Sequence, residues 1–205
     1  MRAVAVIGAG SLGIVVAGLA ARAGYEVRIA GSGDPKFIAL KVRTEAPGAM
    51  STDAATALEG AEIVVLALPL HRVTELAPVA LSGRVVVDAT NYWAAVDGPL
   101  PMFTDHPGGT SAAVAAALPG ARVVKSLNHV GAADLAGHSR DRRRIAIGVA
   151  SNHQPAADAV AQFVTQLGFE PVAIGGLDRG VAMQPGSAVF GRALTHDAFV
   201  NATSG

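Results

Sequence analysis

The chain has 205 residues, which suits one fairly large domain or a main domain with a small extension. Its 16 basic and 16 acidic residues cancel, so no global field attracts nucleic acid or an anionic membrane, and we expect neither partner. The absence of cysteine excludes disulfides, thiolate catalysis and cysteine-ligated metal sites, so any redox chemistry has to come from a bound organic cofactor.

Apolar runs in the chain are short, although its mean hydropathy of +0.40 is high. The runs at 63–68 and 85–87 are far below the roughly 20 residues of a membrane-spanning helix, and they predict buried strands instead. Gly8, Gly10 and Gly13 interrupt the apolar N-terminus, so we do not interpret it as a signal peptide and expect a cytoplasmic protein.

Along the chain, β-branched runs alternate with alanine-rich stretches of helical length, which is typical of βα units around a buried parallel sheet. We predict strands at 3–7, 27–30, 63–67, 85–88, 122–126, 145–150 and 171–174, with a further short strand near Ala49. We predict helices at 11–23, 35–42, 52–59, 73–81, 111–118 and 155–167, several of them with a proline start or a glycine stop. The loop at 94–109 is long enough to suggest a function, and the tail after residue 174 has no clear pattern.

A glycine-rich loop follows the first strand and opens the first helix, with the sequence Gly8-Ala9-Gly10-Ser11-Leu12-Gly13. In such a loop Gly8 permits the tight turn, Gly10 lets the backbone approach a pyrophosphate, and Gly13 lets the helix pack close to the strand. The free amides and the positive dipole end of the helix then face the phosphates. Glycine turns also serve tight packing alone, but strand, spacing and helix together indicate a dinucleotide site.

The turn after the second strand bears on the choice between NAD and NADP. An acidic residue at the end of that strand would bond the ribose hydroxyls of NAD, but Gly31 and Ser32 stand there instead. Small residues, the Ser32 hydroxyl and the Lys36 ammonium would admit and bind a 2′-phosphate, which favours NADP. Asp34 argues against this interpretation, unless it only caps the helix that follows.

The loop and the alternating pattern predict an α/β fold, a doubly wound and mostly parallel Rossmann sheet with a small C-terminal α/β extension. We expect residues 1–124 to form the NADP-binding domain. Residues 125–205 are expected to continue the sheet and to complete the site of a second substrate.

Further loops follow strands at the carboxyl edge of the sheet, where ligands of open α/β folds bind. Leu68 and Pro69 are expected to cover the nicotinamide half of the cofactor, or to form only a rigid turn. Asn91 precedes Tyr92 and Trp93, whose rings could stack on a planar ligand or pack under the long loop.

Asn128 and His129 follow the strand at 122–126 and so reach the same edge. His129 could act as an acid or base, could only hydrogen-bond a ligand, or could be structural like most lone histidines. We expect His71 to begin the following helix rather than to exchange protons. The other histidines show no metal-ligand spacing, so we predict no metal site, and we interpret the basic run at 140–144 as solvent-facing.

Segments spread over almost the whole chain resemble the NADPH-dependent coenzyme F-420 reductase family, whose members pass hydride between NADP and a deazaflavin. The resemblance is carried by residues 1–13, 31–32, 66–69, 87–93, 125–129 and 168–172. It implies that residues 9–12 and Ser32 contact NADP(H), and that later loops hold coenzyme F-420. The family often has arginine after this serine, where the chain has Gly33, so phosphate recognition would either pass to Lys36 or be weaker. Hydride transfer between two rings needs no catalytic side chain, and we predict none.

Other functions remain open at this point. The chain could reduce an ordinary flavin, a metal chelate, or a small carbonyl or imine compound, although β-hydroxyacid-type dehydrogenases carry a long helical domain and little chain follows Ile174 here. It could also be a dinucleotide-sensing module without catalysis. We expect a homodimer, because a second copy could complete a site that one short chain cannot.

Overall fold

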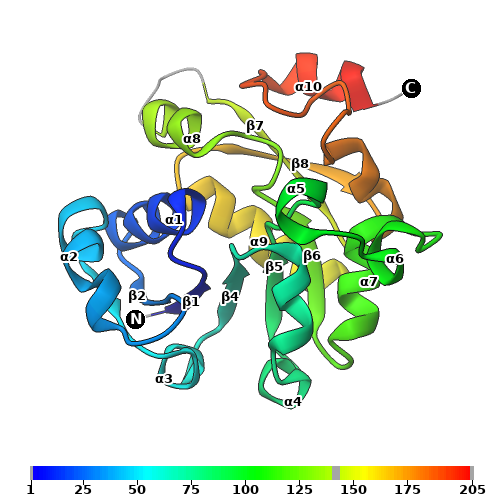
Figure 1. Ribbon diagram of the computed structural model, residues 1–205. Helices are drawn as coiled ribbons and strands as arrows, with labels where there is room; N and C mark the ends of the chain where they lie inside the picture. The colour runs from blue at the N-terminus through cyan, green and yellow to red at the C-terminus, as the bar shows by residue number, and fades with distance from the viewer. Residues whose placement is uncertain (1, 140–143, 204–205) are drawn as a thin grey trace.

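The computed structural model describes residues 2–139 and 144–203, so most of the basic run at 140–144 lies outside the described residues. The strands form an eight-stranded sheet in the order β3-β2-β1-β4-β5-β6-β7-β8 (Figure 1). Neighbouring strands run parallel, except β6 and β7, which are antiparallel. The predicted doubly wound, mostly parallel Rossmann sheet is confirmed.

The predicted strands are all present; of the seven with predicted bounds, three have those bounds and four differ by one residue at one or both ends. They are β1 Ala3–Ile7, β2 Glu26–Ala30, β3 Ala49–Ser51, β4 Ile63–Leu66, β5 Val85–Asp88, β6 Arg122–Ser126, β7 Ala146–Ala150 and β8 Glu170–Gly175. The sheet is continuous across the predicted domain boundary at residue 124, which falls inside β6.

Helices connect these strands on both faces of the sheet. They are α1 Ser11–Arg22, α2 Lys36–Glu45, α3 Ala54–Leu58, α4 Pro78–Leu81, α5 Ala94–Asp97, α6 Pro101–Thr104, α7 Gly109–Ala117, α8 Ala132–His138, α9 Gln154–Gln166 and α10 His196–Thr203, with 3₁₀ helices η1 Leu70–Glu75 and η2 Leu177–Met183. The loop predicted at 94–109 therefore contains two single-turn helices, α5 and α6.

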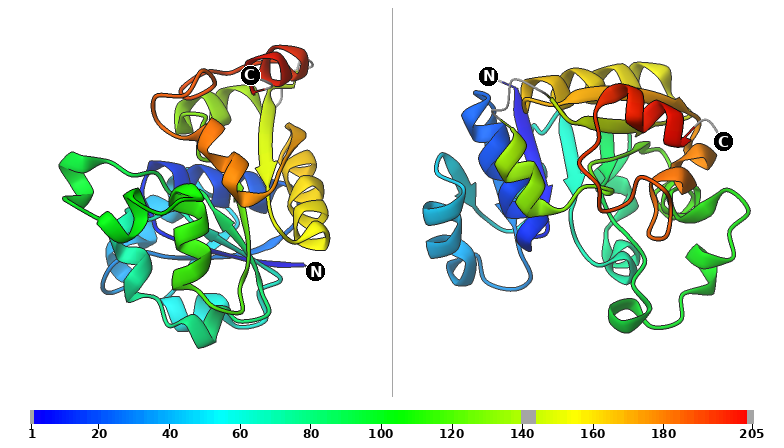
Figure 2. Two further views of the ribbon diagram at one scale, coloured as in Figure 1. Left: turned by 90° about the vertical axis from the view of Figure 1, so that its right-hand side faces the viewer. Right: turned by 90° about the horizontal axis from the view of Figure 1, so that it is seen from above.

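The core has two main layers because alternate strand residues face opposite sides of the sheet. In β1, Val4 and Val6 pack in one layer, while Ala5 and Ile7 pack in the other. Helices α1, α8 and α9 cover the first face, and α3, η1, α4 and α7 cover the second, with α9 and α7 on opposite sides of the sheet in Figure 2. The loops with polar residues lie at the carboxyl edge of the sheet, between these two layers.

The single helix predicted at 73–81 is wrong, because the chain forms η1, an extended link and then α4. Leu76 and Ala77 have extended backbone angles, with ψ of 140° and 111°. Pro78 explains the break, since its ring disfavours a helical conformation at Ala77 and it offers no amide hydrogen. Its place in the first turn of α4 suits a proline.

The tail that lacked a sequence pattern folds against β7 and β8. Met183, Val189 and Phe199 are buried there against Ala146 and Ala150. The tail lies over this end of the sheet, above α5 in Figure 1. Its packing brings residues near 190 to the same edge as the glycine loop.

Candidate functional site

The glycine loop lies where β1 and β4 are neighbours and the strand order reverses, which is where open α/β sheets bind ligands. Gly8 has a φ of +118°, and a Cβ there would be 2.0 Å from the carbonyl oxygen of Ala67. A Cβ on Gly13 would be 1.8 Å from the carbonyl oxygen of Gly8. The predicted needs for a tight turn at Gly8 and close helix packing at Gly13 are therefore confirmed.

Gly10 differs from these two glycines, because the fold does not require it. Its φ of −73° and ψ of −174° are ordinary extended backbone, and a Cβ there would meet no atom within 4 Å. The missing side chain leaves open space at the start of α1. That space is what a backbone-bound pyrophosphate needs.

The N-terminus of α1 has free capacity for an anion. Gly10 is its N-cap and offers no side chain, and the first turn contains no acidic residue. The amides of Ser11, Leu12 and Gly13 therefore have no side-chain cap, and no acidic side chain of that turn neutralises the positive end of the helix dipole. Together with the open space at Gly10, this arrangement fits a phosphate group.

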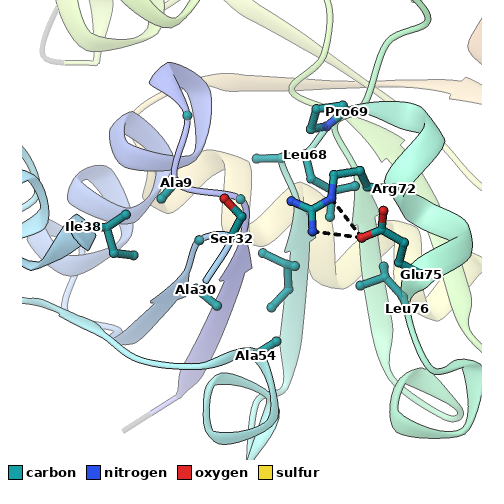
Figure 3. A pocket seen from close by; sticks show the side chains of 15 residues that line it. Ala9, Ala30, Ser32, Ile38, Ala54, Leu68, Pro69, Arg72, Glu75 and Leu76 are labelled. Carbon is teal, nitrogen blue, oxygen red and sulfur yellow. Dashed lines mark hydrogen bonds and ion pairs between the residues drawn. The ribbon is translucent and has the colours of Figure 1, made fainter. Parts of the chain in front are cut away.

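A first cavity of about 500 Å³ extends from the glycine loop between the ends of β2 and η1 (Figure 3). It is lined by Ile7, Gly8, Ala9, Gly10, Ala30, Gly31, Ser32, Ile38, Ala54, Ala67, Leu68, Pro69, Arg72, Glu75 and Leu76. The predicted Gly31 and Ser32 therefore lie in the same cavity as the loop. Its position beyond β2 is where the adenosine half of a dinucleotide binds in this fold.

Lys36, the predicted phosphate ligand, is not among the residues that line this cavity. Its side chain is 89% exposed, and its Nζ lies 3.9 Å from a carboxylate oxygen of Asp34. Asp34 also accepts a hydrogen bond of 2.9 Å from the Lys36 backbone amide. Asp34 thus caps the start of α2, as the alternative interpretation of this carboxylate predicted.

Arg72 and Glu75 line the first cavity, and the sequence analysis missed both. They lie in η1, where Nε of Arg72 donates to Oε2 of Glu75 at 2.9 Å and Nη2 lies 2.8 Å from the same oxygen. A sequence signal was present, because charges at i and i+3 after a strand-end proline lie on one face of a helical turn. Which way that face points could not be predicted, because the helix expected at 73–81 is broken before Pro78.

A second cavity of about 440 Å³ adjoins the first at the carboxyl edge. Its wall consists of the start of α1, the ends of β4, β5 and β6, α5 and the tail: Gly10, Ser11, Leu12, Ala67, Leu68, Pro69, Ala89, Thr90, Asn91, Trp93, Val96, Asp97, Asn128, His129, Val130, Gly131, Ala132, Phe190 and Gly191. Gly10, Ala67, Leu68 and Pro69 line both cavities. The predicted residues Asn91, Asn128 and His129 are brought together here.

Asn91 and Asn128 are hydrogen-bonded to each other across neighbouring strand ends. Nδ2 of Asn91 donates to the Asn128 carbonyl at 2.8 Å, and Nδ2 of Asn128 donates to Oδ1 of Asn91 at 3.0 Å. Asn128 also donates to the carbonyl of Met183 at 2.7 Å, which ties the tail to the site. The two loops and the tail therefore form one rigid wall.

A buried ion pair supports this wall from below. Lys125 and Asp88 have fully buried side chains, with Nζ 3.2 Å from Oδ2 and 2.5 Å from the Thr90 carbonyl. Asp88 also accepts from the Thr90 amide and hydroxyl and from the Ser111 hydroxyl. Burial lowers the pKa of Lys125, and the Asp88 carboxylate opposes this shift. The pair fixes the chain at Thr90, directly before Asn91.

His129 is almost fully buried and packs against Phe199, with ring centroids 5.1 Å apart. Its Nε2 accepts from the Gly148 amide at 3.1 Å, so the hydrogen-bond pattern assigns the proton of the neutral ring to Nδ1. Burial, with a contribution from the Lys125 charge, lowers the pKa of His129 from 6.5 to about 4. The structure therefore favours a neutral packing role over proton exchange.

This pKa predicts that stability falls in acid. Because the folded pKa lies below the unfolded value of 6.5, the unfolded chain binds the proton more readily. Above pH 6.5 the His129 ring is neutral in both states and costs no stability. As the pH falls toward about 4, the unfolded chain takes up the proton first, and the free energy of unfolding falls by about 3 kcal/mol. Urea unfolding of the wild type and His129→Asn at pH 7.5 and pH 4 measures it, and the variant should lack this part of the pH dependence. His153→Asn, at an exposed position, is the control. An equal loss of unfolding free energy between pH 7.5 and pH 4 in all three proteins would contradict the prediction.

His71 lies in the first turn of η1, at the start of the helix that follows β4, as predicted; it lines neither cavity and hydrogen-bonds to α5. Its backbone amide and Nδ1 lie 3.1 and 2.8 Å from Oδ1 of Asp97. Burial opposes ionisation of Asp97, but hydrogen bonds from the Trp93 amide and His71 outweigh it and hold the pKa of the carboxyl below its usual value. Asp97 thereby anchors α5 and holds Trp93 beside the second cavity.

Metal clusters and membrane-spanning helices are both absent from residues 2–139 and 144–203. No group of three or more histidine, aspartate and glutamate side chains in this part of the chain is arranged to hold a metal ion. No helix within the same ranges is long and apolar enough to cross a bilayer.

The sheet, the glycine loop at its switch point and the cavity beyond β2 define a Rossmann protein with the features of a dinucleotide site. Residues 3–92 match the family model described as NADP oxidoreductase, coenzyme F420-dependent, so the predicted resemblance to this family is confirmed over these residues. The match supports an NADP oxidoreductase. No curated protein matches the chain in sequence.

Two solved structures resemble this chain over nearly its whole length. A hypothetical protein from Sinorhizobium meliloti is 29% identical, with a TM-score of 0.78 over 96% of this chain and 97% of that one. A protein from Arthrobacter sp. FB24, whose name proposes an F420-dependent NADP-reductase, is 24% identical, with a TM-score of 0.73 over 96% and 100%. A 3-hydroxyisobutyrate dehydrogenase from Mycobacterium tuberculosis shares the fold at 15% identity and a TM-score of 0.65, over 89% of this chain and 57% of that one.

Proposed function

We propose that this chain transfers hydride between NADP(H) and a deazaflavin coenzyme of the F-420 type. The observation that carries the proposal is the shared wall of the two cavities, formed by Gly10, Ala67, Leu68 and Pro69. A dinucleotide that begins at the glycine loop would fill the first cavity with its adenosine half and reach this wall with its nicotinamide. A second planar ring in the second cavity would then face it.

The residues at the glycine loop suit the dinucleotide. The open space at Gly10 and the free amides of Ser11 and Leu12 would hold the pyrophosphate, while Ala9, Gly31 and Ser32 would contact the adenosine side. Leu68 and Pro69 would pack against the nicotinamide, which supplies the hydride chemistry when it is bound. The chain's own task is to position the ring and exclude water.

The second cavity suits a planar, largely apolar acceptor. Trp93 is 48% exposed at its rim and packs edge-on against Phe190 at a centroid distance of 5.7 Å. Asn91 and Asn128 add a hydrogen-bonding wall behind the aromatic pair. We propose that residues 125–205 complete this second-substrate site, since Asn128, His129 and Phe190 all come from that part of the chain.

The proposed residues act without a catalytic acid or base. Hydride transfer between two rings depends on holding them at reacting distance, which binding geometry alone can supply. His129, with a pKa of about 4, would remain neutral and would contribute to the wall of the second cavity. Nothing in this arrangement requires a nucleophile.

The test is to mix the protein with NADPH and to offer, in separate reactions, oxidised F-420, ordinary flavins, metal chelates, and small carbonyl or imine compounds, following nicotinamide absorbance. Turnover with F-420 alone is the expected result. Turnover only with flavins or chelates, or only with carbonyls or imines, would replace the deazaflavin by that acceptor. Tight NADPH binding without any turnover would instead indicate a sensing module. Sedimentation with and without NADPH tests the homodimer, which we also propose.

Substituting Trp93 tests the acceptor cavity by itself. We expect Trp93→Ala to raise the KM for F-420 about fivefold, since aromatic stacking contributes about 1 kcal/mol beyond its buried area. The NADPH Kd should stay unchanged, because Trp93 does not line the first cavity. Trp93→Phe is the matched control and should retain most of the affinity. An unchanged KM in the alanine variant would remove Trp93 from the proposed site.

A further inference from the structure

The first cavity holds a single cationic side chain among the described residues that line it, and that side chain is Arg72. The other wall residues near the end of β2 are Gly31, Ser32 and the apolar Ile38. Figure 3 shows the guanidinium of Arg72 reaching from η1 across the cavity toward Ser32. The cavity therefore has the Ser32 hydroxyl on one side and, on the other, the Arg72 guanidinium paired with the Glu75 carboxylate.

Arg72 is held in place without using up its donors. Glu75 engages Nε and Nη2 through one carboxylate oxygen, and the Arg72 backbone amide donates to the Pro69 carbonyl at 3.0 Å. Nη1 makes no hydrogen bond to the part of the chain that the structure describes, so this edge of the fork stays available. The Arg72 side chain is 38% exposed, so an incoming anion can reach it.

We propose that Arg72, with Ser32, recognises the 2′-phosphate of NADP and sets the preference for NADP over NAD. The inference rests on the proposed function, whose cofactor it makes specific. A guanidinium offers a phosphate parallel N–H donors and a full positive charge. The neutral 2′-hydroxyl of NAD gains much less from both, so the contact favours NADP. Glu75 pre-orients the fork from the solvent side, since its own side chain is 55% exposed.

Lys36 is the cation that the sequence predicted for this role, and its geometry makes it the weaker partner. Its side chain is 89% exposed, lies 3.9 Å from the Asp34 carboxylate and is absent from the cavity wall. A solvated ammonium of this kind contributes little to a specific contact. In this chain Arg72, on the opposite wall of the cavity, would thus take the place of the arginine that the family often has after the serine.

The experiment measures Kd for NADPH and NADH by isothermal titration, with wild type, Arg72→Met, Arg72→Lys and Lys36→Met. Methionine keeps the apolar stem of each side chain, and both positions are partly or largely exposed, so the variants should fold. We expect Arg72→Met to weaken NADPH about 10- to 100-fold and NADH less than about twofold. Arg72→Lys should fall between, and Lys36→Met should change NADPH by about twofold at most.

The outcomes separate the inference from the proposed function. Equal losses for NADPH and NADH in Arg72→Met would show that Arg72 stacks on the adenine, and a larger loss in Lys36→Met would move the phosphate site to α2; either overturns the inference. Adenosine 2′,5′-bisphosphate against 5′-AMP provides a second readout that needs no acceptor. A wild type that binds neither dinucleotide, or that prefers NADH, would overturn the proposed function together with the inference.

Discussion

Gly10→Asp is expected to abolish NADPH binding while leaving the protein folded, with a Kd raised at least about 100-fold, equivalent to about 2.7 kcal/mol. The new carboxylate would occupy the open space before α1 and repel the pyrophosphate that we place there. Fluorescence or calorimetric titration with NADPH measures this loss directly.

The fold should not suffer, and this makes the variant informative. The Gly10 backbone angles suit any residue, and aspartate is a better N-cap than glycine because its side chain accepts from the first helix amides. We therefore expect an unchanged or slightly raised Tm in thermal unfolding. Gly10→Asn is the matched control, since it has the same size without the charge and separates steric blocking from repulsion. Full NADPH affinity in the aspartate variant would contradict the placement of the pyrophosphate.

Lys125→Met is expected to have the largest effect on stability, a loss of about 3–5 kcal/mol in the free energy of unfolding. The variant would leave the Asp88 carboxylate fully buried without its cation, retaining only the hydrogen bonds from Thr90 and Ser111. Urea unfolding followed by circular dichroism at pH 7 measures the loss.

The double variant Lys125→Met with Asp88→Asn tests whether the buried charge is the cause. An asparagine can still accept from Thr90 and can donate to the Ser111 hydroxyl, so the double variant should recover part of the loss. Strictly additive losses in this double-mutant cycle would mean that the two side chains do not stabilise each other. A loss below about 1 kcal/mol in Lys125→Met would mean that the carboxylate finds water or another partner.

The position of the second cavity also bears on the Lys125 variant. If Lys125 supports the Thr90–Asn91 segment, its loss should weaken binding of the proposed deazaflavin more than binding of NADPH, because Asn91 lines only the second cavity. The Gly10 and Lys125 variants thus probe the two cavities separately, one through binding and one through the rigidity of a wall.

The sequence by itself determined the sheet and the dinucleotide loop. Both depend on short-range patterns, namely β-branched runs of strand length and glycines whose spacing matches a single turn between β1 and α1. Such patterns are local, so they can be read without knowing how distant parts of the chain pack. The break of the helix predicted at 73–81 was also readable in principle from Pro78.

Only the tertiary structure decided which charged side chains face the cavities. Lys36 and Arg72 are both cations near strand ends, but only the second lines the first cavity. Likewise Lys125 lies 37 residues from Asp88 in the chain, and no periodicity signals that they pair. Contacts of this kind depend on how separate loops converge at one edge of the sheet, and a chain pattern does not encode that convergence locally.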